Sequence, residues 1–406
     1  MLDEKTLTAE VAALEQEVVG HRRAVHRMAE LSGHEVNTSA YVKQTLEALG
    51  IPVRTMEGTG LLGILDTGRP GPHIGLRADM DALPLPEDVC NLSRERVVRS
   101  DTPDKTCHAC GHDAHVAMLL GAAKLLTAHK DDLCGIIYFA FESGEENGAG
   151  IAPMLKTLDD YQIDTFWAIH VLSALPSGTI CVSAGPRMAG AAIISLDFIG
   201  RGGHGSRPDL SINPVFCAAN YLVNLAVAFQ NQIDANETVT LGVTSIQGGE
   251  AANVFPDSAK VLGSIRFFNR DEGAKAAGIL KEVATDTAKY LNCRVEFDPR
   301  MERVGNPLVN DGYYAGLIGE RLQTVLGEGH VVKAEPWYAS ESFGYYLMRS
   351  PGVMAHLGIR NEALGTGAEH HNSRFDVDES VLTTGVRATV EYVLTVIEKG
   401  VKPANA

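Results

Sequence analysis

The sequence is poor in the features that place a protein in a membrane or outside the cell. No stretch comes near the roughly 18 consecutive apolar residues of a membrane-spanning helix. The first ten residues have neither the basic patch nor the apolar segment of a secretory signal peptide. The seven cysteines are odd in number and scattered, which fits a reducing compartment better than a disulfide framework. We therefore expect a cytoplasmic protein with no membrane partner.

Basic residues are also scarce, with 35 Lys and Arg against 51 Asp and Glu, for a formal net charge of −16. Binding to phosphates needs a basic surface, so this balance argues against a nucleic-acid partner. The Gly-x-Ser-x-Gly elbow of many serine hydrolases is absent after any predicted strand. The 406 residues, 45% of them hydrophobic, exceed what one core usually supports, so we expect more than one domain.

One short stretch concentrates residue types that bind metals. The nine residues from Cys107 to His115 contain three imidazoles, two thiols and one carboxylate. A thiolate beside imidazoles suits zinc or another late first-row metal. A histidine taken singly is more often a surface or core residue, but distant side chains can complete a metal site together with this stretch. The candidates for that role are Glu145, Glu146, His170, His370 and His371.

Two pairs of carboxylates accompany this stretch. Asp79 and Asp81 lie two residues apart on an extended segment, so their side chains point the same way. They either cap a loop or orient metal-binding imidazoles. Glu145 and Glu146 lie in a glycine-rich turn after a predicted strand, where sites form in open α/β sheets. They are either an exposed acidic turn or a pair in which one binds metal and the other handles protons.

The two thiols of the stretch admit a different interpretation. Cys107 and Cys110 have the spacing of a redox pair, and a helix that begins here would favour thiolate at Cys110. No second cysteine pair of a zinc ribbon exists, and the flanking histidines favour a metal over a dithiol. Replacing each cysteine separately would distinguish these two hypotheses.

The order of predicted elements indicates the fold class. Buried strands alternate with amphipathic helices up to about residue 185, which predicts an α/β domain with a mixed, mostly parallel sheet. The pattern then changes to strands and two helices of a small α+β domain. We predict a discontinuous domain of residues 1–186 and 300–406, with a second domain inserted at 187–299.

Seven motifs, in order, resemble those of the M20 metallopeptidase family. The resemblance is strongest to its amidohydrolase branch, which includes hippurate hydrolases, N-acyl-amino-acid aminoacylases and indole-acetyl-amino-acid hydrolases. It spans almost the whole chain. The motifs are Arg77-Ala-Asp-Met-Asp-Ala-Leu-Pro84, His108-Ala-Cys-Gly-His-Asp113, Gly144-Glu-Glu146, Ile169-His170, Gly202-Gly-His204, Asn253-Val-Phe-Pro-Asp257 and His371-x-x-Arg-Phe-Asp376.

The resemblance implies a centre of two divalent metal ions, with Zn, Mn, Co and Ni all compatible with its ligand types. It also implies that residues 1–186 and 300–406 form the catalytic domain, that the insertion at 187–299 is a lid or dimerisation domain, and that the protein is a homodimer. By position in the motifs, the implied metal ligands are Cys110, His112, Glu146, His170 and His371.

The same motifs imply roles for side chains that do not bind metal. Glu145 is implied to be the general base, and Asp81 the residue that orients an imidazole ligand. His204 is implied to face the substrate and to stabilise the oxyanion. Asn253 and Arg266 are candidates for binding the polar end of the substrate.

We therefore predict a metal-dependent enzyme that hydrolyses the amide bond of an N-acyl amino acid, or of a related small amide or dipeptide. The products are a carboxylate and an amino acid. The alternatives on the same site are a dipeptidase and an N-carbamoyl-amino-acid hydrolase. A different class of protein, a catalytically silent ligand-binding relative, is disfavoured because Glu145 and all the implied ligands are present.

Overall fold

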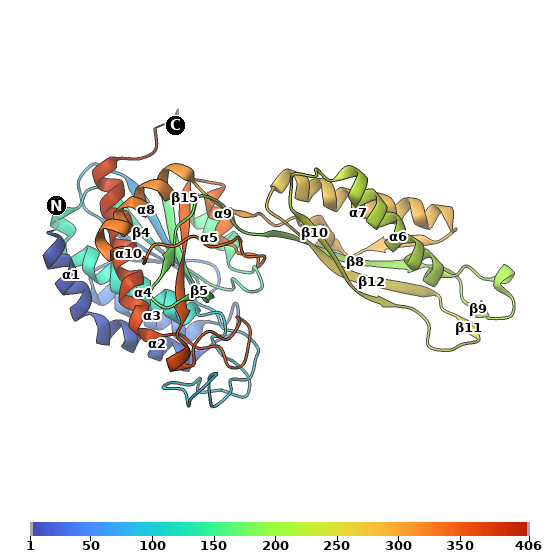
Figure 1. Ribbon diagram of the computed structural model, residues 1–406, viewed down its shortest axis with the longest axis horizontal. Coiled ribbons are helices and arrows are strands. Elements are labelled where there is room, and N and C mark those ends of the chain that lie inside the picture. The colour runs from blue at the N-terminus through green and yellow to red at the C-terminus, as the bar shows by residue number, and fades with distance from the viewer. Residues whose placement is uncertain (1–2, 404–406) are drawn as a thin grey trace. The chain divides into compact units, whose positions relative to one another are not determined.

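The computed structural model describes residues 3–403 of the chain (Figure 1). Within these residues, the structure divides into two compact units, each with its own hydrophobic core. The larger unit comprises residues 3–185, 310–335 and 345–403, and the smaller unit comprises residues 186–309 and 336–344. A chain of this length thus distributes its apolar residues between two cores, as the scaling of core size leads one to expect.

The larger unit is built on a seven-stranded sheet. Its strands are β1 (Val53–Thr55), β2 (Leu61–Asp66), β3 (His73–Asp79), β4 (Ile136–Glu142), β5 (Thr165–Pro176), β6 (Ile180–Cys181) and β15 (Gly352–Arg360). They lie in the order β1-β2-β4-β3-β5-β15-β6, and the four central strands run parallel. The remaining strands pair antiparallel with their neighbours at the two sides. The predicted α/β class with a mixed sheet is therefore confirmed.

Helices cover this sheet and complete the core of the larger unit. They are α1 (Glu4–Ala13), α2 (Glu15–Met28), α3 (Val36–Ala48), α4 (His112–Ala128), α5 (Ile151–Leu158), α8 (Gly312–Leu326) and α10 (Leu382–Lys399). α4 and α10 pack against each other and against β5 (Figure 1). Almost every residue of α4 is buried, so this helix anchors whatever its first turn carries.

The apolar spacing over residues 5–30 predicts helical structure, which is confirmed, but it does not show where one helix ends and the next begins. The structure has two helices, α1 and α2, which meet at Leu14. Leu14 itself keeps right-handed helical dihedrals (φ −84°, ψ −6°), so the apolar spacing continues across the break. A break of this kind leaves the hydrophobic pattern unchanged, which is why periodicity does not reveal it.

Among the described residues, one helical segment is long and apolar enough to cross a membrane by length and composition. It is Glu379–Lys399, which contains α10, and 72% of its apolar window is buried inside the structure. The core helix of a globular unit has the same length and composition, and the packing of α10 against α4 and α8 is that of a core helix.

The smaller unit is an α+β structure with its own antiparallel sheet. Its elements are β8 (Gly190–Ile199), β9 (Gly203–His204), α6 (Pro214–Gln232), β10 (Val239–Gln247), β11 (Val254–Phe255), β12 (Ser258–Phe267), α7 (Arg270–Tyr290) and β13 (Arg294–Phe297). The main sheet has the order β10-β12-β8-β13, and both helices lie on the same face of it (Figure 1). Asn213 and Asn269 cap the two helices by accepting backbone N–H bonds in their first turns.

Several short elements escape detection in the sequence. β7 (Gly185–Met188) pairs with β14 (Leu308–Asn310), and α9 (Phe343–Leu347) is only 5 residues long. The amphipathic pattern of residues 309–327 predicts a helix, but α8 begins only at Gly312, because residues 308–310 form β14 and Asp311 caps α8. The 3-10 helices are η1 (Lys130–Asp132), η2 (Pro208–Leu210), η3 (Pro299–Glu302), η4 (Glu362–Leu364) and η5 (Glu379–Val381).

Strand register brings the motifs of the larger unit together. β3 and β4 are parallel neighbours in which Asp79 pairs with Glu142, the last residue of each strand. The acidic turn of Glu145 and Glu146 therefore follows β4 at the edge where Asp81 follows β3. In open α/β sheets, ligands bind at this carboxyl edge.

Candidate metal centre

The cysteine and histidine motif enters the site through a tight backbone turn. Gly111 is the N-cap of α4 and has a left-handed backbone (φ +87°). A methyl group added at this position would lie 2.3 Å from Cγ2 of Val171, so both the dihedral and the space require glycine. This turn separates Cys110, which precedes the helix, from His112, its first residue.

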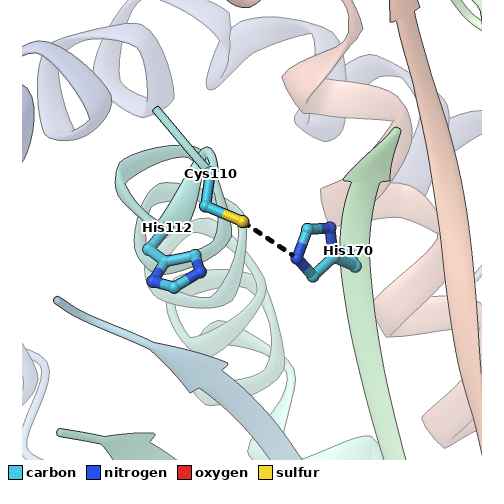
Figure 2. A group of neighbouring side chains, drawn as sticks. All are labelled: Cys110, His112 and His170. Carbon is cyan, nitrogen blue, oxygen red and sulfur yellow. Dashed lines mark hydrogen bonds between the residues drawn. The ribbon is translucent and has the colours of Figure 1, made fainter. Parts of the chain in front are cut away.

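Residues from distant parts of the chain place metal-ligand atoms at one point of the larger unit. Two groups each have all their ligand atoms within 4.8 Å of one another, and both contain Cys110. One consists of Cys110, His112 and His170, and the other of Cys110, Glu146 and His371. Figure 2 shows the first group, in which Cys110 Sγ lies 3.6 Å from His170 Nε2. The five side chains that the motifs single out as ligands are therefore neighbours in space.

Hydrogen bonds leave the Nε2 atoms of two histidines directed at this point. His170 donates from Nδ1 to the carbonyl oxygen of Val171 at 2.7 Å, which leaves the lone pair on Nε2. His112 Nδ1 lies 3.1 Å from Asp81 Oδ1, and its buried Nε2 has no hydrogen-bond partner among the described residues. A metal-binding histidine characteristically donates its other N–H to a carboxylate or backbone carbonyl. These residues therefore fit a divalent metal ion.

Asp81 connects two of the candidate ligands. Its Oδ1 faces His112, while its Oδ2 accepts hydrogen bonds from the Ser32 hydroxyl at 2.6 Å and from the backbone N–H of Glu146 at 3.0 Å. Burial alone would raise the pKa of Asp81, but the hydrogen bond and charge of His112 outweigh it and lower that pKa. An ionised Asp81 thus positions both the imidazole and the acidic turn. Sequence reasoning did not identify Ser32, and no motif in the sequence marks it.

Acidic groups make the site strongly attractive to a cation. Burial by itself would lower the pKa of His112, but the charge of Asp79 and the hydrogen bond that His112 donates to Asp81 hold it well above its usual value. Glu145 and Glu146 also place their ligand atoms within 4.8 Å of His112. These carboxylates favour a positive charge beside them, and a bound cation would supply it.

The second acidic residue of the turn reaches toward the C-terminal motif. Glu146 Oε1 lies 3.2 Å from His371 Nε2, and this neighbour helps to lower the pKa of Glu146 against the effect of burial. The backbone N–H of His371 donates to the carbonyl oxygen of Ala109 at 2.8 Å, which ties the two motifs together. His371 also has a left-handed backbone (φ 61°), a strained state that tends to persist at functional sites.

The other two histidines of the motif, His108 and His115, belong to neither of the groups that contain Cys110. His115 donates from Nδ1 to Asp79 at 2.6 Å and accepts from the backbone N–H of Val171 at 2.9 Å. Both of its ring nitrogens are therefore occupied, and burial lowers its pKa to about 4. Asp79, His112 and His115 do gather ligand atoms within 4.8 Å, but His115 has no lone pair to give. His108 is buried and belongs to none of the gathered groups.

Beneath the site, a buried ion-pair network holds Asp79 in place. Arg77 donates to Asp79 at 2.7 Å and to Glu142 at 2.9 Å, and Glu142 also accepts from the Tyr346 hydroxyl at 2.8 Å. Asp79 therefore binds His115 and Arg77, and its Oδ2 also lies 3.7 Å from His112 Nε2. The sequence pairs Asp79 with Asp81 by spacing, and the fold brings both carboxylates to His112.

The redox hypothesis for Cys107 and Cys110 finds no support in their surroundings. Both cysteines are buried free thiols. Burial raises the pKa of Cys107 to about 12 and raises the pKa of Cys110 well above its usual value. Burial therefore opposes the thiolate that the helix N-terminus is expected to favour at Cys110. A reactive dithiol needs a low pKa, whereas a metal ligand loses its proton to the metal.

The remaining predicted site residues lie in the smaller unit. β9 pairs with β11 so that His204 lies opposite Val254, which brings the neighbouring Asn253 close to His204. His204 Nδ1 lies 2.8 Å from the Ser206 hydroxyl. Arg266, on β12, donates to the Ser340 hydroxyl at 2.7 Å. The roles of His204, Asn253 and Arg266 toward a substrate stay predictions.

The site lies at the carboxyl edge of a mixed α/β sheet and brings together a thiol, imidazoles and carboxylates. Such a site is typical of a metal-dependent hydrolase. The chain belongs to peptidase family M20/M25/M40, whose model matches residues 75–395. It is 35% identical over 392 residues to thermostable carboxypeptidase 1 of Saccharolobus solfataricus, covering 94% of this chain and 96% of that protein. It is 33% identical over 371 residues to IAA-amino acid hydrolase ILR1-like 4 of Arabidopsis thaliana, covering 91% and 83%.

A solved structure agrees with this assignment. The Bacillus subtilis YXEP protein, a dinuclear metal binding peptidase from the M20 family, superposes with a TM-score of 0.79 at 28% sequence identity. The match covers 95% of this chain and 99% of that chain. The family resemblance inferred from the seven motifs and the prediction of a metal-dependent hydrolase are therefore confirmed.

Proposed function

We propose that this enzyme hydrolyses the amide bond of an N-acyl amino acid and releases a carboxylate and an amino acid. The observation that carries the proposal is the convergence of Cys110, His112, Glu146, His170 and His371 next to a further carboxylate, Glu145. Among the similar proteins, one is an IAA-amino acid hydrolase and one a carboxypeptidase, and both names describe cleavage of a bond to an amino acid.

We propose that these five side chains hold two divalent ions. Cys110 belongs to both gathered groups, which favours it as the ligand that the two ions share. A mixture of thiolate, imidazole and carboxylate ligands is compatible with Zn, Mn, Co or Ni. Such ions supply Lewis acidity toward the substrate carbonyl and lower the pKa of a water molecule.

Glu145 is the proposed general base. Glu146 Oε1 lies close to His371 Nε2. Glu145 has a ligand atom within 4.8 Å of ligand atoms of His112 and Glu146. In this role Glu145 takes a proton from the attacking water and passes it to the departing amine, so the same carboxyl group serves both halves of the reaction. Because a carboxylate beside bound cations stays ionised, it is available as a base near neutral pH.

The smaller unit is the proposed inserted lid and dimerisation domain. His204 would stabilise the oxyanion, and Asn253 and Arg266 would bind the polar end of the substrate. A guanidinium suits the carboxylate of an amino acid because it donates two parallel hydrogen bonds.

A second copy of the chain is the proposed partner of the smaller unit. Phe216, Val223 and Val227 are 65%, 66% and 55% exposed, and they recur on α6 at spacings that place them on one side of the helix. β10 stands at one edge of the four-stranded sheet, where a further strand can pair. A monomeric mass by light scattering would reject the homodimer.

The acidic net charge and the free cysteines favour the cytoplasm as the location of the protein.

The decisive experiment compares two adjacent carboxylates. Metal-loaded wild type should hydrolyse N-acetyl amino acids or hippurate, and EDTA should abolish this activity. Glu145→Gln should retain bound metal and lose about 10²–10⁴-fold in kcat, the usual contribution of a general base. Glu146→Gln is the matched control, and it should lose metal as well as activity.

Two results would reject the proposal. One is a Glu145→Gln enzyme that retains more than a small fraction of wild-type turnover. The other is a wild-type enzyme that, loaded with each metal in turn, cleaves only dipeptides or N-carbamoyl amino acids.

A further inference from the structure

The C-terminal motif carries two adjacent histidines, and the first of them also reaches Cys110. His370 Nδ1 lies 3.7 Å from Cys110 Sγ, about as close as His170 Nε2, which lies 3.6 Å from the same sulfur. The His370 ring is held between two others, with ring centroids 5.5 Å from His170 and 4.8 Å from Phe375. A ring packed on two sides has little freedom to turn away.

Hydrogen bonding determines which nitrogen of His370 carries the proton. The backbone N–H of Ser173 donates to His370 Nε2 at 3.2 Å. An N–H cannot donate to a protonated nitrogen, so Nε2 presents its lone pair and the proton of the ring is on Nδ1. Nδ1 is the atom that faces Cys110, which makes His370 a hydrogen-bond donor to the sulfur.

The neighbouring contacts agree with this direction. His170 donates from Nδ1 to the Val171 carbonyl, so its Nε2 can only accept a proton from Cys110 or bind a metal ion. Donation therefore runs one way, from the Ser173 backbone through His370 to Cys110, and from Cys110 to His170. When a cation replaces the thiol proton, the first half of this chain is unchanged and the sulfur still receives the N–H of His370.

We propose that His370 is a positioning residue that donates a hydrogen bond from Nδ1 to the Cys110 thiolate, and that it does not itself bind metal. This inference rests on the proposed function, because it assumes that Cys110 is a metal ligand. A hydrogen bond to an ionised acceptor is stronger than one to a neutral acceptor. It fixes the direction of the sulfur and withdraws negative charge from it, which leaves the bound ion a stronger Lewis acid.

His370 and His371 therefore have different proposed roles. His371, whose Nε2 faces Glu146, belongs to the gathered ligand atoms, and His370 does not. Hydrogen bonds to a metal ligand from outside the coordination sphere typically change metal affinity by about 10–100-fold when they are removed. Loss of the His370 donor should therefore be visible in the properties of the bound metal as well as in turnover.

The test uses the full-length protein loaded with Co²⁺, whose bond to thiolate gives a near-ultraviolet charge-transfer band. His370→Leu should shift this band to lower energy and raise the Kd for Co²⁺ about tenfold or more, without changing the number of ions bound. His370→Asn should restore most of both properties, because the Asn amide can place an N–H close to the position of Nδ1. Phe375→Leu is the packing control and should leave the band in place.

Three outcomes would overturn the proposal. The first is a His370→Leu protein with the band position and Kd of wild type, and the second is a His370→Asn protein indistinguishable from His370→Leu. The third is the loss of a bound ion in His370→Leu, which would make His370 a ligand. Absence of the band in wild type would instead refute metal ligation by Cys110, and with it the proposed site as a whole.

Discussion

The substitution Asp81→Asn isolates the contribution of the residue that links two candidate ligands. It exchanges one carboxylate oxygen for an amide nitrogen at nearly constant size. Asp81 Oδ1 faces His112 Nδ1 at 3.1 Å, and Oδ2 accepts from the Ser32 hydroxyl and the Glu146 backbone. An amide has one acceptor and one donor end, so it cannot serve both sides.

Either orientation of the amide disturbs the site. If the NH₂ group faces His112, the imidazole must accept at Nδ1 and carry its proton on Nε2, the atom directed at the metal. If the NH₂ group faces the Glu146 backbone, two donors oppose each other and the acidic turn moves. Losing one hydrogen bond to a charged group costs about 1.5–3 kcal/mol. At 1.4 kcal/mol for each factor of ten, metal Kd should rise about 10–100-fold.

The assay is a competition for Zn²⁺ or Mn²⁺ between the protein and a chromophoric chelator at fixed pH. Asp160→Asn is the matched control, because Asp160 is exposed and its carboxylate accepts a hydrogen bond from Arg54 at the surface. At saturating metal, Asp81→Asn should recover a large part of its activity. A wild-type Kd together with a reduced kcat would refute the reasoning, since Asp81 would then act in the reaction and not on its ligands.

Three further predictions concern the thiols, a buried ion pair and the smaller unit. Cys110→Ser should lose bound metal, measured by elemental analysis after gel filtration, while Cys107→Ser should keep it; the reverse result would favour the dithiol hypothesis. Burial alone would lower the pKa of His26, but hydrogen bonds to two buried carboxylates outweigh it and raise that pKa. A raised folded pKa stabilises the fold fully below about pH 6.5, and the stabilisation is lost as pH rises through the folded value. Relative to His26→Gln, wild type should therefore lose about 1.4 kcal/mol of unfolding free energy for each unit of that shift. The measurement uses urea unfolding in a Trp337→Phe background, which leaves a single tryptophan, in the larger unit; an equal pH dependence of both proteins would contradict the raised pKa. His204→Ala should retain bound metal and lose about 10²–10³-fold in kcat, the usual cost of removing one oxyanion donor, and unchanged steady-state kinetics would remove His204 from the site.

Much of the larger unit was open to prediction because its signals are local. The run Leu61-Leu-Gly-Ile-Leu-Asp predicts a strand and coincides with β2, and the apolar run after His115 predicts a helix to about Ala128, where α4 ends. Alternation and helical spacing report on whether a segment has one buried face or two, which is what defines these elements. The break at Leu14 was missed because it alters the backbone and leaves the apolar spacing intact.

By itself, the sequence determined the class of the site. Cys110 and His112 lie on either side of one glycine, so their proximity follows from the chain, and the order of the other motifs identified the family. These are properties of residue type and spacing. They do not depend on how distant segments meet.

Only the tertiary structure decided which of several identical side chains does what. His112 and His115 share the first turn of α4. The backbone N–H of Val171 donates to Nε2 of His115, whereas Nε2 of His112 has no hydrogen-bond partner among the described residues. His370 and His371 are adjacent, yet Ser173 fixes the first as a donor while the second faces Glu146. The role of an imidazole depends on which of its two nitrogens is protonated, and that is set by hydrogen bonds from strands far away in the chain.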